Sequence, residues 1–140
     1  MTDEALLAKR LAFIETCVHE LQTLARLDLI DHDIREARFV EHTLQLAIQA
    51  ALDVASHIVS DRRLGEPATN QQLFTLLVGD GWLAADQLPA LRAMAGFRNV
   101  LVHGYTDVDR AVVKDVVEHR LGDLLALVAR VRARLAAPAS

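Results

Sequence analysis

The sequence predicts a single all-α domain over residues 1–140, built as an up-and-down bundle of four to five helices. Alanine and leucine dominate the chain, whereas glycine (6 residues), proline (3 residues) and aromatic residues (4 %) are scarce. Apolar residues recur at steps of three and four in several long segments, which places them on one face of a helix. With 140 residues, 52 % of them hydrophobic, the chain is long enough to bury one core and too apolar to be disordered.

The first helix is predicted over residues 4–29. A single apolar stripe runs along it from Leu7 to Ala25. The acidic residues that follow predict a turn, in which Asp31 or Asp33 is available to cap the next helix because a short carboxylate accepts hydrogen bonds from free backbone N–H groups.

The second helix is predicted over residues 33–63, and it is apolar nearly all round. Between Glu41 and Asp61, Asp53 is the only acidic or basic residue. A helix of this kind is buried on several sides, and in so small a domain this suggests a partner chain as well as the domain's own core. Asp53 then needs a partner, which we expect on a neighbouring helix.

The middle of the chain predicts two further helices, over residues 69–79 and 86–102. Trp82 follows the first of them and is expected to anchor that turn in the bundle. Pro89 is compatible with the second because it falls in the first helical turn.

The last helix is predicted as one continuous element that ends near residue 136. The segment from Thr106 to Asp109 resembles a capping box, and an apolar seam then runs from Val113 to Leu135.

Charge and composition restrict the functional class. The net charge of −4 gives no overall basic surface for nucleic acid, so any RNA contact must use a local patch. The N-terminus is acidic, unlike a signal peptide, and the longest stretch without charged residues, 67–79, is too short to cross a membrane. We therefore expect a cytoplasmic protein without a membrane span. Cys17 is the only cysteine, which excludes an internal disulfide and favours a small core residue.

The histidines outside the motif described below do not predict a metal site. No pair of them has the i, i+4 spacing of a zinc-binding helix, and no cysteine or carboxylate set completes one. We expect structural or surface roles and no metal for His19, His32, His42, His57 and His119.

The segment from Arg98 to Tyr105 carries the chemistry of the chain. Arg98 can stabilise phosphate charge and His103 can move protons near neutral pH, the pair that a metal-free ribonuclease needs. On an ideal helix the two positions lie roughly 140° apart, so a shared site requires a frayed helix end or a second copy of the chain. A purely structural interpretation also exists, because basic residues and a following glycine are ordinary at a helix C-terminus.

A resemblance to a known family favours the catalytic interpretation over the structural one. Arg98-x4-His103-x-Tyr105, within the longer segment from Met94 to Tyr105, resembles the Arg-x4-His-x-Tyr motif of HepT-like toxins in the HEPN superfamily. The predicted second helix from Arg35 and the approach from Gly81 to Met94 are similar to the same family, although Gln87 and Leu88 depart from its pattern.

The resemblance implies a HEPN-like domain that acts as a metal-independent endoribonuclease without a cofactor. It implies a homodimer whose cleft holds two motif copies, with Arg98 and His103 catalytic and Asn99 in a supporting role. It also implies a partner, a nucleotidyltransferase antitoxin that attaches AMP to Tyr105.

Two questions stay open at this level. The basic pair Arg62 and Arg63 is either a solvated helix end or a contact for the RNA backbone. Arg35 and Arg38 could equally face acidic groups of a partner. The alternative function is a HEPN interaction module that dimerises and binds the nucleotidyltransferase without cutting RNA, and the complete Arg98–His103 pair favours the nuclease.

Overall fold

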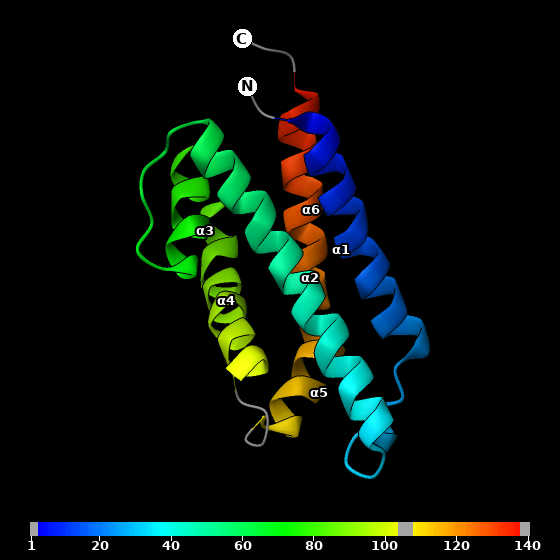
Figure 1. Cartoon of the computed structure of the whole chain (residues 1–140). Coiled ribbons are helices and arrows are strands. Elements are labelled where there is room, and N and C mark those ends of the chain that lie inside the picture. Colours follow the sequence, from blue (N-terminus) through cyan, green and yellow to red (C-terminus); the bar gives the residue numbers. More distant parts are fainter. Residues whose placement is uncertain (1–2, 104–107, 138–140) are drawn as a thin grey trace.

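The computed structural model describes residues 3–103 and 108–137, and within them every regular element is helical. The all-helical prediction is confirmed. The described part contains two 3₁₀ turns and six α-helices: α1 (Glu4–Leu24), α2 (Ile34–Asp61), α3 (Asn70–Gly79), α4 (Leu88–His103), α5 (Arg110–His119) and α6 (Leu121–Ala136) (Figure 1).

Helix α1 ends earlier than its apolar pattern predicts. Ala25 takes an extended conformation, and Leu27–Leu29 form a 3₁₀ turn rather than a further helical turn. The N–H of Arg26 donates to the carboxylate of Glu36 on α2, at 3.1 Å, so the connecting segment is held by the next helix. Apolar periodicity does not reveal this helix end, because Leu27 of the 3₁₀ turn and Ile30 after it still pack in the core.

The helix starts follow the rule that short polar side chains cap free N–H groups. Asp33 accepts a hydrogen bond from the N–H of Arg35, which confirms one of the two predicted caps for α2. Thr69 caps α3 in the same way. The predicted capping box before the last helix is wrong, because Asp109 itself caps α5 and the helix begins at Arg110.

The predicted last helix is two helices. The break falls at Arg120, which ends α5 and precedes α6. The apolar residues on either side of it, Val117 and Leu121, keep a four-residue step and are both buried, so the seam crosses the break without an irregularity. Gly122 favours a break here because glycine weakens a helix by about 0.5–1 kcal/mol relative to alanine.

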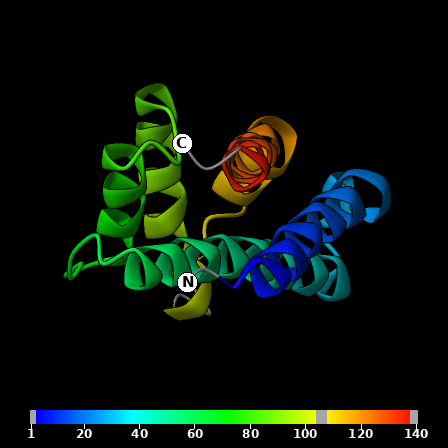
Figure 2. The ribbon, with the colours of Figure 1, turned by 90° about the horizontal axis from the view of Figure 1, so that it is seen from above.

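Helix α2 is the centre of the molecule. It packs against α1 and α6 on one side and against α3 and α4 on the other, and Figure 2 shows these two groups distributed along it. Thirteen of its residues are buried, including Ala50 and Leu52 outside the main stripe. The several apolar faces of α2 are therefore covered by the chain's own helices. These faces of α2 do not require the partner chain that their apolar pattern suggested.

Trp82 is 3 % exposed and packs in the core, as predicted. Within the part of the chain that the structure describes, no helix has both the length and the apolar character of a membrane span.

Candidate functional site

The arginine–histidine motif lies at the C-terminal end of α4, and both Arg98 and His103 belong to that helix. Because α4 stays helical as far as His103, the two positions lie about 140° apart around its axis. The helix therefore does not unwind early enough to bring them onto one face within one chain. Tyr105, the third residue of the motif, lies outside the described residues.

Arg98 is half-buried, and its side chain is only partly satisfied. One guanidinium nitrogen, Nη1, donates to Oδ1 of Asn99 at 3.3 Å. The Nε atom is buried and has no hydrogen-bond partner in the described part of the molecule. This donor is open to a water molecule or a ligand, as is the buried Nε2 of Gln87.

Asn99 is exposed and contacts Arg98 through its side-chain oxygen. Asn99 accepts the hydrogen bond from the Arg98 guanidinium through the carbonyl end of its amide.

A groove of about 430 Å³ lies between α2 and the end of α4. We call it the α2 groove. Its polar wall comes from Arg38, Glu41, His42 and Gln45 on α2, and its apolar wall comes from Leu101 on α4 and Val108 before α5.

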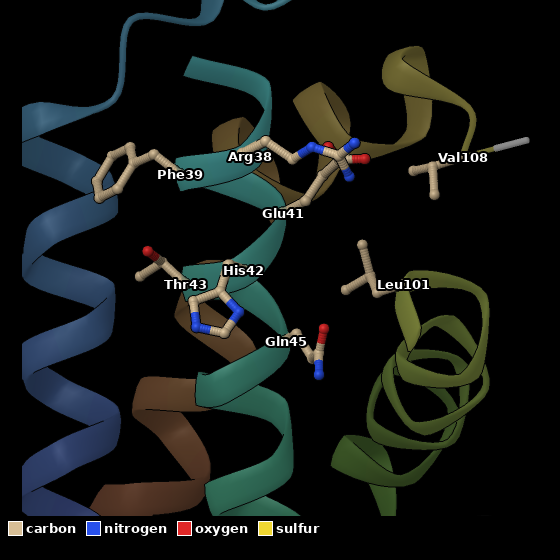
Figure 3. Close-up of a pocket in the computed structure, with 8 residues that line it drawn as sticks. All are labelled: Arg38, Phe39, Glu41, His42, Thr43, Gln45, Leu101 and Val108. Carbon is tan, nitrogen blue, oxygen red and sulfur yellow. The ribbon is translucent and has the colours of Figure 1, made fainter. Parts of the chain in front are cut away.

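Figure 3 shows how the side chains of the α2 groove are directed. Arg38, Glu41 and Gln45 extend from α2 toward the side of Leu101 and Val108, whereas Phe39 and Thr43 point the other way, toward α1. The groove is therefore lined on α2 by mostly polar side chains, with Phe39 among them, and across from it by aliphatic side chains.

The α2 groove borders the motif. Leu101 is two residues before His103, and Val108 is three residues after Tyr105, so the apolar wall is formed by the residues on both sides of the motif's end. Sequence reasoning did not select Glu41 or Gln45. The available signal was that positions 38, 41, 42 and 45 bring polar side chains to one face of an otherwise apolar helix.

The polar side chains of this wall have no protein partners in the part of the chain described by the structure. None of Arg38, Glu41, His42 and Gln45 takes part there in a hydrogen bond or ion pair. One cation, one carboxylate, one imidazole and one amide are thus available to a ligand.

Arg62 and Arg63 lie at the opposite end of α2. Arg62 ends that helix, with its guanidinium 5.4 Å from the ring centre of Trp82 and 3.9 Å from the carboxylate of Asp80. About 20 residues of helix separate it from the α2 groove, which corresponds to roughly 30 Å. The structure does not bring Arg62 or Arg63 to the motif.

Arg62 is part of a closed cluster that we call the Trp82 latch. Arg134 of α6 lies 4.9 Å from the ring centre of Trp82 and donates to the backbone oxygen of Asp80 at 2.8 Å. The indole N–H of Trp82 donates to the carboxylate of Asp80 at 3.1 Å. The latch consists of Arg62, Asp80, Trp82 and Arg134, and it joins the end of α2, the turn after α3 and the end of α6.

Asp53 also has a structural partner. Nε2 of Gln49 donates to its carboxylate at 2.9 Å. The partner lies one turn earlier on the same helix, not on a neighbouring helix as the sequence suggested.

Cys17 is buried in the core. Burial disfavours the thiolate and, with a smaller effect from Glu20, raises the pKa of Cys17 to about 11. A thiol with this pKa is protonated at neutral pH and is not a nucleophile. Among the described residues, no group of three His, Cys, Asp or Glu side chains is placed to hold a metal ion.

Comparison with known proteins places the chain in a family. The family model for HepT-like ribonucleases matches residues 13–131. The mRNA nuclease HepT of Shewanella oneidensis is 29 % identical over 119 residues, which cover 84 % of this chain and 90 % of that protein. The tRNA nuclease HepT of Aphanizomenon flos-aquae is 29 % identical over 109 residues, which cover 76 % of this chain and 74 % of that protein.

Solved structures agree with these matches. A tri-AMPylated HEPN toxin of Shewanella oneidensis in complex with MNT antitoxin is similar with a TM-score of 0.83 and 28 % identity, covering 95 % of this chain and 99 % of that one. A toxin–antitoxin structure with AMP-PNP gives a TM-score of 0.85 at 26 % identity, covering 92 % of this chain and 98 % of that one. The cytosolic protein YutE of Bacillus subtilis gives 0.87 at 17 % identity, covering 99 % of this chain and 96 % of that one, which supports the fold alone. The chain belongs to the HepT-like ribonuclease family.

Proposed function

We propose that this protein is the toxin of a toxin–antitoxin pair and that it cleaves RNA without a metal ion, using Arg98 and His103. The observation that carries the proposal is the state of Arg98, whose Nε is buried and unpaired on the helix that ends in His103. The names of its relatives, an mRNA nuclease and a tRNA nuclease, support RNA as the substrate.

The chemistry of RNA cleavage fits these residue types. Attack by the 2′-hydroxyl on the adjacent phosphate requires removal of the hydroxyl proton, stabilisation of a more negative phosphorane and protonation of the leaving 5′-oxygen. His103 acts as general base or acid, a role worth about 10²–10⁴-fold in rate. Arg98 holds the non-bridging oxygens with its planar guanidinium, which Asn99 keeps in place.

The active unit is a homodimer. Since Arg98 and His103 lie about 140° apart on α4, one chain does not direct both positions toward one point. A two-fold axis beside the ends of two α4 helices presents the same surface twice and supplies two arginines and two histidines to one cleft.

The partner is a nucleotidyltransferase antitoxin that attaches AMP to Tyr105. The support is that a relative of this chain is a tri-AMPylated toxin in complex with MNT antitoxin. Attached AMP adds bulk and phosphate charge two residues from His103, and this charge repels the RNA backbone.

Cleavage of total RNA in excess chelator tests the nuclease. The parent protein should cut, and Arg98→Ala and His103→Ala should each lose at least about 100-fold in rate. Arg10→Ala is the matched control, because Arg10 is an exposed arginine on α1. An Arg98→Ala variant that cuts like the parent contradicts the mechanism. A folded parent that binds the nucleotidyltransferase but cuts no RNA supports the non-catalytic interaction module instead.

Mass spectrometry after incubation with the nucleotidyltransferase and ATP tests whether AMP is attached to Tyr105. Peptides that contain Tyr105 should gain AMP, and Tyr105→Phe should remove the modification. An inactive complex in which Tyr105 stays unmodified would show neutralisation by masking alone.

A further inference from the structure

We infer that the α2 groove is a nucleotide subsite beside the cleaved bond, in which Arg38 contacts an RNA phosphate and Glu41 and Gln45 select the base. This inference rests on the proposed function, because it assigns to the proposed nuclease a preference for the base beside the cut. It predicts a preference for a base with an exocyclic amino group, that is adenine, cytosine or guanine, over uracil.

The position of the groove favours a nucleotide next to the scissile phosphate. Its apolar wall includes Leu101, which lies three residues after Arg98 and about 60° from it around α4, so an RNA phosphate held at Arg98 lies toward the side of the helix that faces the groove. The volume of about 430 Å³ lies in the range of small-ligand sites, about 300–1,000 Å³.

Arg38 is suited to bind phosphate. It is exposed, it extends into the groove (Figure 3), and no carboxylate in the described part of the chain pairs with it. In a protein with a net charge of −4, such a local cation is what an RNA backbone requires.

The remaining side chains of the wall suit a base. The Glu41 carboxylate only accepts hydrogen bonds, so it favours amino groups and disfavours the carbonyl oxygen at the same position of uracil. The Gln45 amide, one turn along the same face, both donates and accepts. The imidazole of His42 offers a planar surface for stacking, and Leu101 and Val108 offer an apolar one.

Binding tests the Arg38 contact separately from cleavage. The probe is a short fluorescent single-stranded RNA of mixed sequence in which every 2′-hydroxyl is methylated, so that it cannot be cut. Arg38→Gln should weaken its binding and lower the slope of log affinity against log salt by about 0.7, the value for one phosphate contact on a single strand. Arg10→Gln removes the same charge on the exposed surface of α1 and should keep both the parent affinity and the parent slope. Equal affinities and slopes for the two variants overturn the contact.

Cleavage tests base selection. Four RNAs that differ only in the nucleotide beside the cut should be cleaved by the parent more slowly when that nucleotide is uracil. Glu41→Gln should change the ratio of amino-bearing base to uracil by about tenfold, since one base contact is worth about that factor. Glu66→Gln, in the exposed loop before α3, is the control and should keep the parent ratio.

The outcomes separate the two proposals. A parent that cuts RNA with a ratio unchanged by Glu41→Gln, and with Arg38→Gln equal to Arg10→Gln, overturns the subsite and leaves the nuclease standing. A parent that binds the methylated RNA through Arg38 but cuts no RNA contradicts the nuclease and retains the groove as an RNA site. A parent that neither binds nor cuts contradicts both.

Discussion

The two ends of α2 use arginine in opposite ways. At its C-terminal end, Arg62 lies over Trp82 and near Asp80, where Arg134 completes the Trp82 latch. At its N-terminal end, Arg38 faces the α2 groove and has no ion pair within the described part of the chain. Nearby on α4, Arg98 keeps a buried Nε without a partner there.

The contacts of an arginine separate a structural charge from one that is available to a ligand. An arginine whose donors and face are taken up by the protein stabilises the fold and has little left for a ligand. An exposed arginine such as Arg38 that has no protein partner among the described residues is hydrated and stays available to a ligand. The sequence suggested an RNA contact for Arg62 and acidic groups of a partner for Arg38, and the contacts of the two side chains in the fold give each a different role.

The largest expected effect on stability comes from Trp82→Ala. Trp82 is 3 % exposed and its ring is contacted by the guanidinium groups of Arg62 and Arg134, so its removal should cost about 3–5 kcal/mol of unfolding free energy. Urea denaturation measures the loss. Trp82→Phe, which keeps a ring, should lose less, and a loss below about 1 kcal/mol for Trp82→Ala would show that the latch is not a structural element.

Smaller changes in stability, of opposite sign, are expected for alanine substitutions at Gly81 and Gly122. Gly81 has φ of +81°, and an added Cβ would lie 3.0 Å from Nη1 of Arg134, so Gly81→Ala should destabilise by roughly 1–2 kcal/mol. Gly122 lies in α6 with nothing within 4 Å of an added Cβ, so Gly122→Ala should stabilise by about 0.5–1 kcal/mol. Thermal unfolding of both variants tests the pair, and the same sign for both would contradict this account.

The smallest effect is expected for the ion pair of Glu15 and Arg132, which joins α1 to α6. The hydrogen bond from Arg132 lowers the pKa of Glu15 below its ordinary value of 4.5. Because the folded pKa is the lower one, the stabilisation is complete above about pH 4.5 and is lost as the pH falls through the folded pKa. Both side chains are more than 40 % exposed, so screening limits the coupling to about 0.2–1 kcal/mol.

A double-mutant cycle of Glu15→Gln and Arg132→Gln measures this coupling by urea unfolding. It should be larger at pH 7 than near about pH 3.5, and a coupling that grows in acid would reverse the assigned sign.

The fold was largely predictable because helical periodicity reports burial directly. The stripes of α1 and α2, the anchor at Trp82 and the cap at Asp33 all follow from residue type and spacing. The break at Arg120 was not predictable, because the apolar seam keeps its spacing across it. The several apolar faces of α2 suggested a partner chain, whereas α3, α4 and α6 cover them.

Only the part of the candidate site whose residues are close together in the sequence was predictable. Arg98, Asn99 and His103 stand close together in the sequence, so their placement on one helix end follows. The wall of the α2 groove lies about 60 residues earlier in the chain, and only the packing of α2 beside α4 brings it to the motif. Glu41 and Gln45 were therefore missed, and Arg62 was considered for RNA contact although the fold uses it elsewhere.

One paired measurement tests the contrast between the two ends of α2 most directly. RNA cleavage in excess chelator and urea unfolding are measured on the same preparations of Arg98→Ala and Arg62→Ala. We predict that Arg98→Ala loses at least about 100-fold in cleavage while its stability changes by less than about 1 kcal/mol. Arg62→Ala should lose about 1 kcal/mol of stability and cut like the parent. An Arg98→Ala protein that cuts normally, or an Arg62→Ala protein that is fully stable and does not cut, would contradict the account.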